Sequence, residues 1–163
     1  RTGWWHELGK YDGFGARYLT WGPQYHAHEF KHCLVGDYRS GTIYRMAPNL
    51  YLDTESAALR RMRIAPGICQ ERKTIFYDLL QLYMETGVAT ATGQGSNPQC
   101  FLRSSDNGGK TWGSERWRSA GATGKFDTEL IWRQRGSAKD RVFMFVMSDP
   151  IPWRLIDCFL ETH

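Results

Sequence analysis

The sequence lacks the patterns that mark several common classes of protein. No apolar run reaches the ~18–20 residues that a membrane-spanning helix needs, so a helical membrane span is excluded. Phosphate-binding loops, dinucleotide fingerprints, nucleophile elbows and zinc-protease helix motifs are missing, which leaves no familiar catalytic or cofactor signature. No strict repeat of fixed period is visible. The net charge is only +4, which does not by itself indicate a nucleic-acid-binding protein.

Aromatic residues and glycines, by contrast, are frequent. The 163 residues include 7 Trp, 8 Tyr, 8 Phe and 17 Gly but only 6 Pro, a mixture typical of short strands joined by tight turns. With 41% hydrophobic and 23% charged residues, the chain is expected to fold rather than to stay disordered. Arginine outnumbers lysine by fifteen to six, and Arg, Trp and Tyr are enriched in the centres of protein interfaces.

The cysteines follow no metal-binding or redox spacing. Cys33, Cys69, Cys100 and Cys158 lie far apart, and no two of them form a CxxC motif. This spacing favours reduced, buried thiols. Two disulfides remain the alternative, since four cysteines allow three pairings.

Short β-rich runs bounded by glycine fill the first third of the chain. Residues 17–21, 32–35 and 42–46 are the expected strands. The segment 32–46, HCLVGDYRSGTIYRM, places two such runs around a polar turn that contains glycine. This pattern predicts a hairpin of the kind found in the blades of β-propellers.

Two segments in the middle are ambiguous between helix and strand. Residues 54–63 have helical propensity, but residues 59, 61 and 63 alternate with 60, 62 and 64, which favours a strand that starts near Leu59. Residues 74–86 contain enough leucine for a helix, yet their alternation and the following Gly87 favour a long strand. The small, polar residues 87–98 predict an exposed, mobile loop.

The final third has the clearest strand patterns. The expected strands there are 99–105, 129–135, 141–148 and 153–161. The apolar run 141–148 predicts a central strand that is buried on both faces. We therefore predict an all-β fold of antiparallel strands. Propeller-blade-like hairpins over residues 1–55 would precede a β-sandwich or closing-blade domain over residues 56–163.

One turn motif stands out between two of these strands. The segment 105–112, SDNGGKTW, resembles the Asp-box, S-x-D-x-G-x-T-W, which forms a β-hairpin turn in sialidases and many other β-proteins. The matching positions are Ser105, Gly109, Thr111 and Trp112, and Asn107 stands where the motif has aspartate. An Asp or Asn side chain can bond the amides of its own turn, glycine accepts a positive φ, and the tryptophan packs against the sheet. The motif predicts a structural turn, not catalysis.

A histidine cluster raises the question of a metal site. His26, His28 and His32 follow an H-x-H-x₃-H pattern, with Glu29 and Cys33 close by, and imidazoles at such spacing can converge on zinc. The simpler interpretation is a strand with two histidines on one face and the third in the next turn. We adopt the simpler one, and predict neither a metal nor any other cofactor.

Three arginines, Arg60, Arg61 and Arg63, form the most basic run. Such a run is usually a solvated surface. Its other potential partners are DNA phosphates or acidic groups of a neighbouring subunit. We keep the three residues as candidates for DNA or subunit contact.

The order of several segments in the second half resembles the C-terminal region of the packaged-DNA stabilisation proteins of short-tailed phages, also called tail hub or nozzle proteins. The segments that carry the resemblance are 85–87, 93–99, 102–112, 115–117, 121–126, 131–143 and 148–161, preceded in the same order by 34–44, 65–68 and 76–82. The resemblance covers roughly residues 30–161, and the first thirty residues match more weakly. It implies either the C-terminal part of such a protein or a shortened relative.

This resemblance implies a non-enzymatic virion component made in the host cytoplasm. Its expected place is the tail, below the portal and the head-to-tail adaptor, as a ring of copies around the DNA channel. It would help to retain packaged DNA and would support distal tail fibres or spikes. DNA in the channel is a further candidate partner.

The alternative is a fragment of an Asp-box β-propeller that binds or hydrolyses carbohydrate. Trp4, Trp5, Trp21 and Trp153 would then stack on sugar rings. Packing in a core or an interface is the simpler role for these side chains. No flanking motif singles out the arginines, tyrosine and acids that a sialidase needs.

Overall fold

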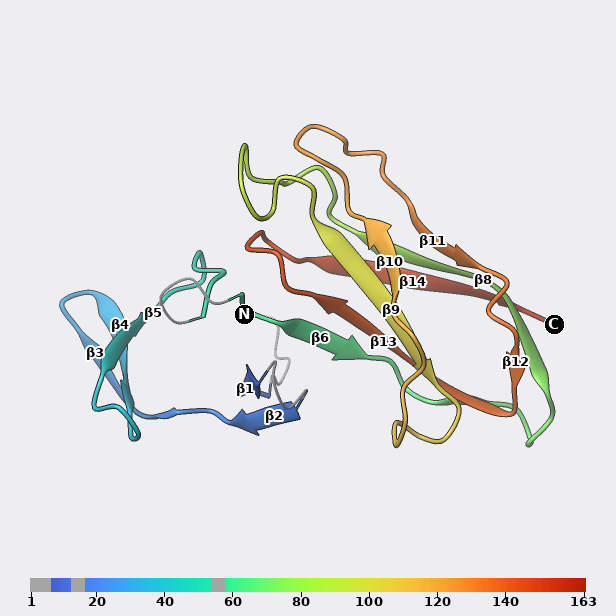
Figure 1. Cartoon of the computed structure of the whole chain (residues 1–163), viewed down its shortest axis with the longest axis horizontal. Helices are drawn as coiled ribbons and strands as arrows, with labels where there is room; N and C mark the ends of the chain where they lie inside the picture. Colours follow the sequence, from blue (N-terminus) through green and yellow to red (C-terminus); the bar gives the residue numbers. More distant parts are fainter. Residues whose placement is uncertain (1–6, 13–16, 54–57) are drawn as a thin grey trace. The chain divides into compact units, whose positions relative to one another are not determined.

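The computed structural model of the chain describes residues 7–12, 17–53 and 58–163 (Figure 1). It divides into two units, Arg1–Leu50 and Tyr51–His163. The predicted boundary between residues 55 and 56 falls in the segment 54–57, outside the described residues. Throughout the described ranges, the structure holds no helix with the length and hydrophobicity that crossing a membrane requires.

The first unit consists of two small antiparallel sheets. Strands β1 (Gly9–Asp12) and β2 (Arg17–Thr20) pair with each other, while β3 (Pro23–Glu29), β4 (His32–Asp37) and β5 (Ile43–Met46) form a three-stranded meander. The predicted hairpin over residues 32–46 is confirmed as β4 and β5. The propeller-blade arrangement stays a prediction, because these strands show no more than separate hairpins and a meander.

The second unit contains two antiparallel sheets. The first sheet has the order β10-β9-β13-β6, and β7 pairs with the other end of β13; the second has the order β11-β8-β12, and β14 pairs with β8. The strands of the first sheet are β6 (Arg61–Ile64), β7 (Ile68–Cys69), β9 (Gln99–Ser105), β10 (Arg116–Ser119) and β13 (Asp140–Met147). Those of the second are β8 (Ile75–Met84), β11 (Leu130–Arg133), β12 (Ser137–Ala138) and β14 (Leu155–Thr162).

The two sheets pack their apolar faces together around one core. Alternate residues point inward, because successive side chains of a strand lie on opposite faces. The inward-facing members include Tyr77, Leu82, Leu102, Trp132 and Phe145, each no more than 3% exposed. Strand β13 is buried over five consecutive residues, 143–147, since its outer face also carries a small apolar cluster. The prediction of a strand buried on both faces is confirmed, and the unit is a β-sandwich.

A β-bulge in β8 changes which residues face the core. Leu79 pairs with Glu161 of β14 and Tyr77 with Thr162, so Asp78 is an extra residue on β8. As a result, the buried positions are odd-numbered up to Tyr77 and even-numbered from Leu80 onward. The strand predicted over residues 74–86 is confirmed as Ile75–Met84, but no local pattern in the sequence marks this bulge.

Several predicted boundaries need correction. The strand expected from Leu59 begins at Arg61, and the strand expected over 129–135 ends at Arg133 because Gln134 adopts a positive φ of 53°. The loop 87–98 is not uniformly exposed, since Gly95 and Pro98 are buried. Its Pro98 carbonyl accepts a hydrogen bond from the amide of Ala120, which fixes the end of the loop beside β10.

The four cysteines are free thiols in the structure. The predicted burial holds fully for Cys100 alone, because Cys33 is half-buried and Cys69 and Cys158 are exposed. Burial raises the pKa of the Cys100 thiol to about 12, so this sulfur stays protonated and unreactive.

Candidate functional site

The turn between β9 and β10 is closed by its own side chains. The hydroxyl of Ser105 accepts a hydrogen bond from the Gly109 amide at 2.9 Å and donates one to Oδ1 of Asn107 at 2.8 Å. That same Oδ1 accepts the Thr111 amide at 2.9 Å, while the Asn107 amide group donates to the Thr111 hydroxyl at 2.7 Å. Gly108 and Gly109 both have positive φ. The five residues singled out in the sequence thus come together, with Trp112 packed on the apolar cluster of the sheet's outer face.

A buried arginine on the neighbouring strand β13 holds this turn. Arg141, only 5% exposed, donates two hydrogen bonds to the carboxylate of Asp106, at 2.6 and 2.8 Å, and a third to the carbonyl of Arg135. Its guanidinium also lies 4.6 Å from the ring centre of Tyr77. No sequence pattern predicts this pair, because Asp106 occupies a variable position of the turn motif and its partner lies 35 residues away.

The three arginines of the basic run do not act as one patch. Arg61 pairs with Met147 on the inner face of the sheet, and Arg63 pairs with Phe145 on the same face. The Arg60 guanidinium instead lies 5.3 Å from the ring centre of Phe101, which belongs to the outer cluster. The alternation of a strand therefore places Arg60 opposite the other two.

Arg61 is engaged within the fold. Its guanidinium donates to the carbonyl of Ile151 at 2.5 Å and to the carbonyl of Asp149, and it lies 5.9 Å from the ring centres of Tyr51 and Trp153. Burial lowers the pKa of this guanidinium, which nevertheless stays charged at neutral pH. Arg61 thus anchors the segment after β13 and is poorly placed to reach DNA phosphates.

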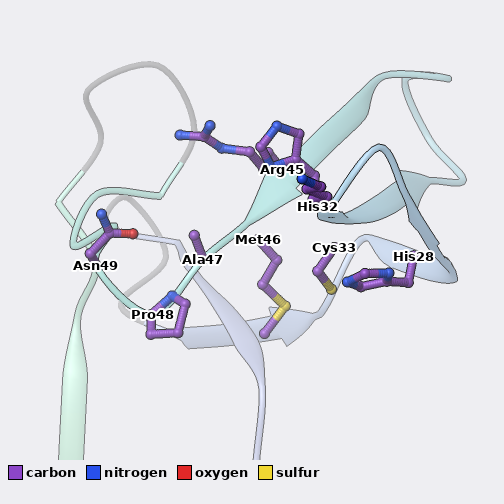
Figure 2. Close-up of a pocket in the computed structure, with 9 residues that line it drawn as sticks. His28, His32, Cys33, Arg45, Met46, Ala47, Pro48 and Asn49 are labelled. Carbon is purple, nitrogen blue, oxygen red and sulfur yellow. The ribbon is translucent and has the colours of Figure 1, made fainter.

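Two of the three histidines, His28 and His32, line a cavity in the first unit. His26 and His28 lie on β3, whereas His32 begins β4 instead of lying in the turn. Nε2 of His26 lies 3.1 Å from the sulfur of Cys33, and Figure 2 shows that sulfur beside the His28 ring and near Met46. The cavity measures about 380 Å³. Within the described residues, no group of three or more His, Cys, Asp or Glu side chains is arranged to hold a metal ion.

A second hollow lies in the sandwich unit, at the end of β8. It measures about 470 Å³ and combines acidic with apolar side chains. We name it the acidic groove; its lining includes Tyr83, Glu85, Phe126, Asp127, Glu129, Arg154 and Ile156. The hydroxyl of the buried Thr86 donates to the carbonyl of Phe126 at 2.7 Å, which holds the loop 121–128 against the strand end.

Large apolar side chains also lie exposed on the outer face of the first sheet. Met62 is 38% exposed, Ile64 44% and Trp117 46%, and the Trp117 ring lies 4.6 Å from that of Phe101. Residues that pair directly across neighbouring strands point to the same face of the sheet. Met62 pairs with Val146, Val146 pairs with Phe101, and Phe101 pairs with Trp117, so these residues share one face. We call this surface the arginine-apolar face; its members are Arg60, Met62, Ile64, Phe101 and Trp117.

The four tryptophans considered for sugar stacking lie in different parts of the chain. Trp4 and Trp5 lie outside the described residues. Trp153 packs against the sandwich core with the Arg61 guanidinium near its ring, and Trp21 is half-buried in the first unit. Trp153 therefore serves the core, which is the simpler of the two roles predicted for it.

The fold and the contacts described so far define an antiparallel β-sandwich whose described polar clusters mainly hold its own turns and strand ends. Comparison with known families agrees with this class. The family model described as "Bacteriophage P22 Gp10, beta-sandwich" matches residues 60–163, nearly the whole second unit. The chain belongs to this family, which is a structural domain of a phage tail protein. A search among curated proteins finds no matching relative.

Proposed function

We propose that the chain is a structural subunit of the tail hub or nozzle of a short-tailed phage. In this role it helps to retain packaged DNA and connects the portal and adaptor to distal tail parts. The observation that carries the proposal is the family match over residues 60–163, which coincides with the β-sandwich. The resemblance of the upstream segments to the same class of tail proteins supports it.

A role in assembly is supported by the surface of the sandwich. Exposed large apolar side chains gather in the acidic groove and on the arginine-apolar face, and such groupings mark sites of protein association. A ring of copies requires two different surfaces on each subunit, and the two sheets of this unit offer them. The partners proposed are copies of the same chain, the portal or adaptor, and distal fibre or spike proteins.

The finer features of the proposal concern three regions. The turn at 105–112 serves as an Asp-box-like structural device, with Asn107 in place of the aspartate; its side-chain hydrogen bonds support this role. The meander of the first unit is proposed to belong to a blade-like body. The arginine run is proposed to contact DNA or a neighbouring subunit, and within it Arg61 already donates hydrogen bonds to two backbone carbonyls.

The proposal is tested with phage particles produced with and without the gene for this protein. We expect the chain in purified tails, visible as repeated copies around the channel by electron microscopy. Particles assembled without it should lose their packaged DNA, which is measured as the fraction of filled heads. Filled, infectious particles that lack the chain would contradict the proposal.

A further inference from the structure

The two outer faces of the sandwich differ in charge. The arginine-apolar face carries Arg60 over the Phe101 ring, and Arg103 lies on the same side of the sheet because it pairs with Met144 of the outer cluster. The acidic groove belongs to the other sheet, and it contains three carboxylates, those of Glu85, Asp127 and Glu129, against one guanidinium, that of Arg154. One chain therefore carries both a basic and an acidic surface.

Each of these surfaces also offers apolar contact area. In the groove, Tyr83 is 53% exposed, Ile156 56% and Phe126 69%. Stable interfaces combine an apolar centre with a polar rim, and complementary charges set the register of the two partners. Exposed aromatic and aliphatic side chains ringed by opposite charges meet this description on both sides of the sandwich.

We propose that the acidic groove of one copy receives the arginine-apolar face of the next copy. The inference rests on the proposed function, since it takes a second copy of this chain as the partner. Charge complementarity favours that partner over an unrelated one, because the surface that matches the groove is present on the chain itself. The two surfaces belong to different sheets of the sandwich, so the contact is head-to-tail, and such contacts close into rings when each step adds a fixed rotation.

Charge reversal tests the contact with the full 163-residue chain. Arg60→Glu changes the basic surface, and Glu129→Lys changes an exposed carboxylate of the groove. Each change places like charges opposite each other, so each should weaken self-association on the order of 100-fold, measured by sedimentation equilibrium over a range of concentration and salt. The matched controls Lys139→Glu and Glu71→Lys alter exposed charges elsewhere on the unit and should leave association unchanged.

Combining the two variants tests whether the groove of one copy contacts the arginine-apolar face of the next. A mixture of the single variants pairs the unaltered groove of one variant with the unaltered face of the other, and it pairs the two altered surfaces with each other. The mixture should therefore associate, although neither variant alone does. The double variant exchanges both charges and should recover much of the association of the unaltered chain. Thermal unfolding of each variant shows that the fold is kept, so that weaker association is not a consequence of unfolding.

The outcomes separate this inference from the function on which it rests. Association that neither reversal weakens would overturn the assignment of the two surfaces while leaving the tail function intact. A chain that stays monomeric at every concentration yet enters tails normally would overturn the copy-to-copy contact and point to another tail protein in the groove. A chain that is absent from tails would contradict the proposed function itself.

Discussion

The two units of the chain bury their apolar residues to very different extents. Among the described residues of the first unit, Val35 is the apolar side chain with less than a tenth of its surface exposed, while Tyr25, Phe30 and Ile43 are 71–86% exposed. The sandwich unit contains a continuous core around Trp132 and Phe145. Because apolar burial is the main source of folding free energy, the sandwich should be stable by its own packing. The described strands of the first unit bury little apolar surface, so packing of this kind contributes less to their stability.

The largest effect should come from a cavity in the sandwich core. Trp132 is 1% exposed, and its indole nitrogen donates to the carbonyl of Arg116 at 2.8 Å. Trp132→Ala removes the ring and this bond, and should lower the free energy of unfolding by about 3–5 kcal/mol. The matched change in the first unit, Val35→Ala, removes less apolar area and should cost about 1–2 kcal/mol. Equal losses in chemical denaturation would break the comparison between the two units.

The second effect concerns the ion pair that links the turn to β13. Asp106→Ala leaves the buried guanidinium of Arg141 with backbone carbonyls as its only hydrogen-bond partners. The free energy of unfolding of the sandwich should fall by about 1–3 kcal/mol. This is less than the cost of breaking a fully buried ion pair, because the Asp106 carboxylate is half-exposed. Adding Arg141→Met to this variant removes the buried charge that has lost its carboxylate partner, and should recover part of the lost free energy of unfolding. A double-mutant cycle measured by urea denaturation checks this, and strictly additive losses would contradict a direct coupling.

The third effect is local strain in the turn. Gly109 has a φ of +89°, and an added Cβ would lie 3.5 Å from the Trp112 ring. Gly109→Ala should therefore cost about 1–2 kcal/mol, mainly through the backbone conformation and not through a clash. Gly124→Ala is the control for conformation alone, since its φ is +84° and nothing lies within 4 Å of an added Cβ. Similar losses for both variants would confirm the conformational cause.

The sequence predicted what depends on local pattern. Strand β9 and the buried run of β13 follow from apolar runs, and the turn follows from Ser105 to Trp112, whose bonds join residues at most four positions apart. The alternation of residues 59–64 also separates Arg60 from Arg61, which lie on opposite faces of the strand. Neighbours in the sequence of a strand are therefore not neighbours on its surface.

The remaining features depend on tertiary contacts and left no local signal. The bulge at Asp78 appears only in the pairing of β8 with β14, some eighty residues later. The bond between Asp106 and Arg141, and the groove between the end of β8 and the loop 121–128, join distant segments in the same way. The family resemblance was recognised because it rests on the order of many short segments, each of them weak alone.

The smallest predicted effect on stability concerns Asn107, which stands where the Asp-box pattern has aspartate. Asn107→Asp keeps the oxygen that accepts the Thr111 amide and the Ser105 hydroxyl. It loses one donor, but the Thr111 hydroxyl can donate to the new carboxylate in place of accepting from the amide group. The free energy of unfolding should therefore change by less than about 0.5 kcal/mol, whereas Asn107→Ala, which removes every one of these bonds, should cost about 1–2 kcal/mol. Comparable losses for the two variants in urea denaturation would show that the turn requires the amide itself, and that asparagine is not a stand-in for the usual aspartate.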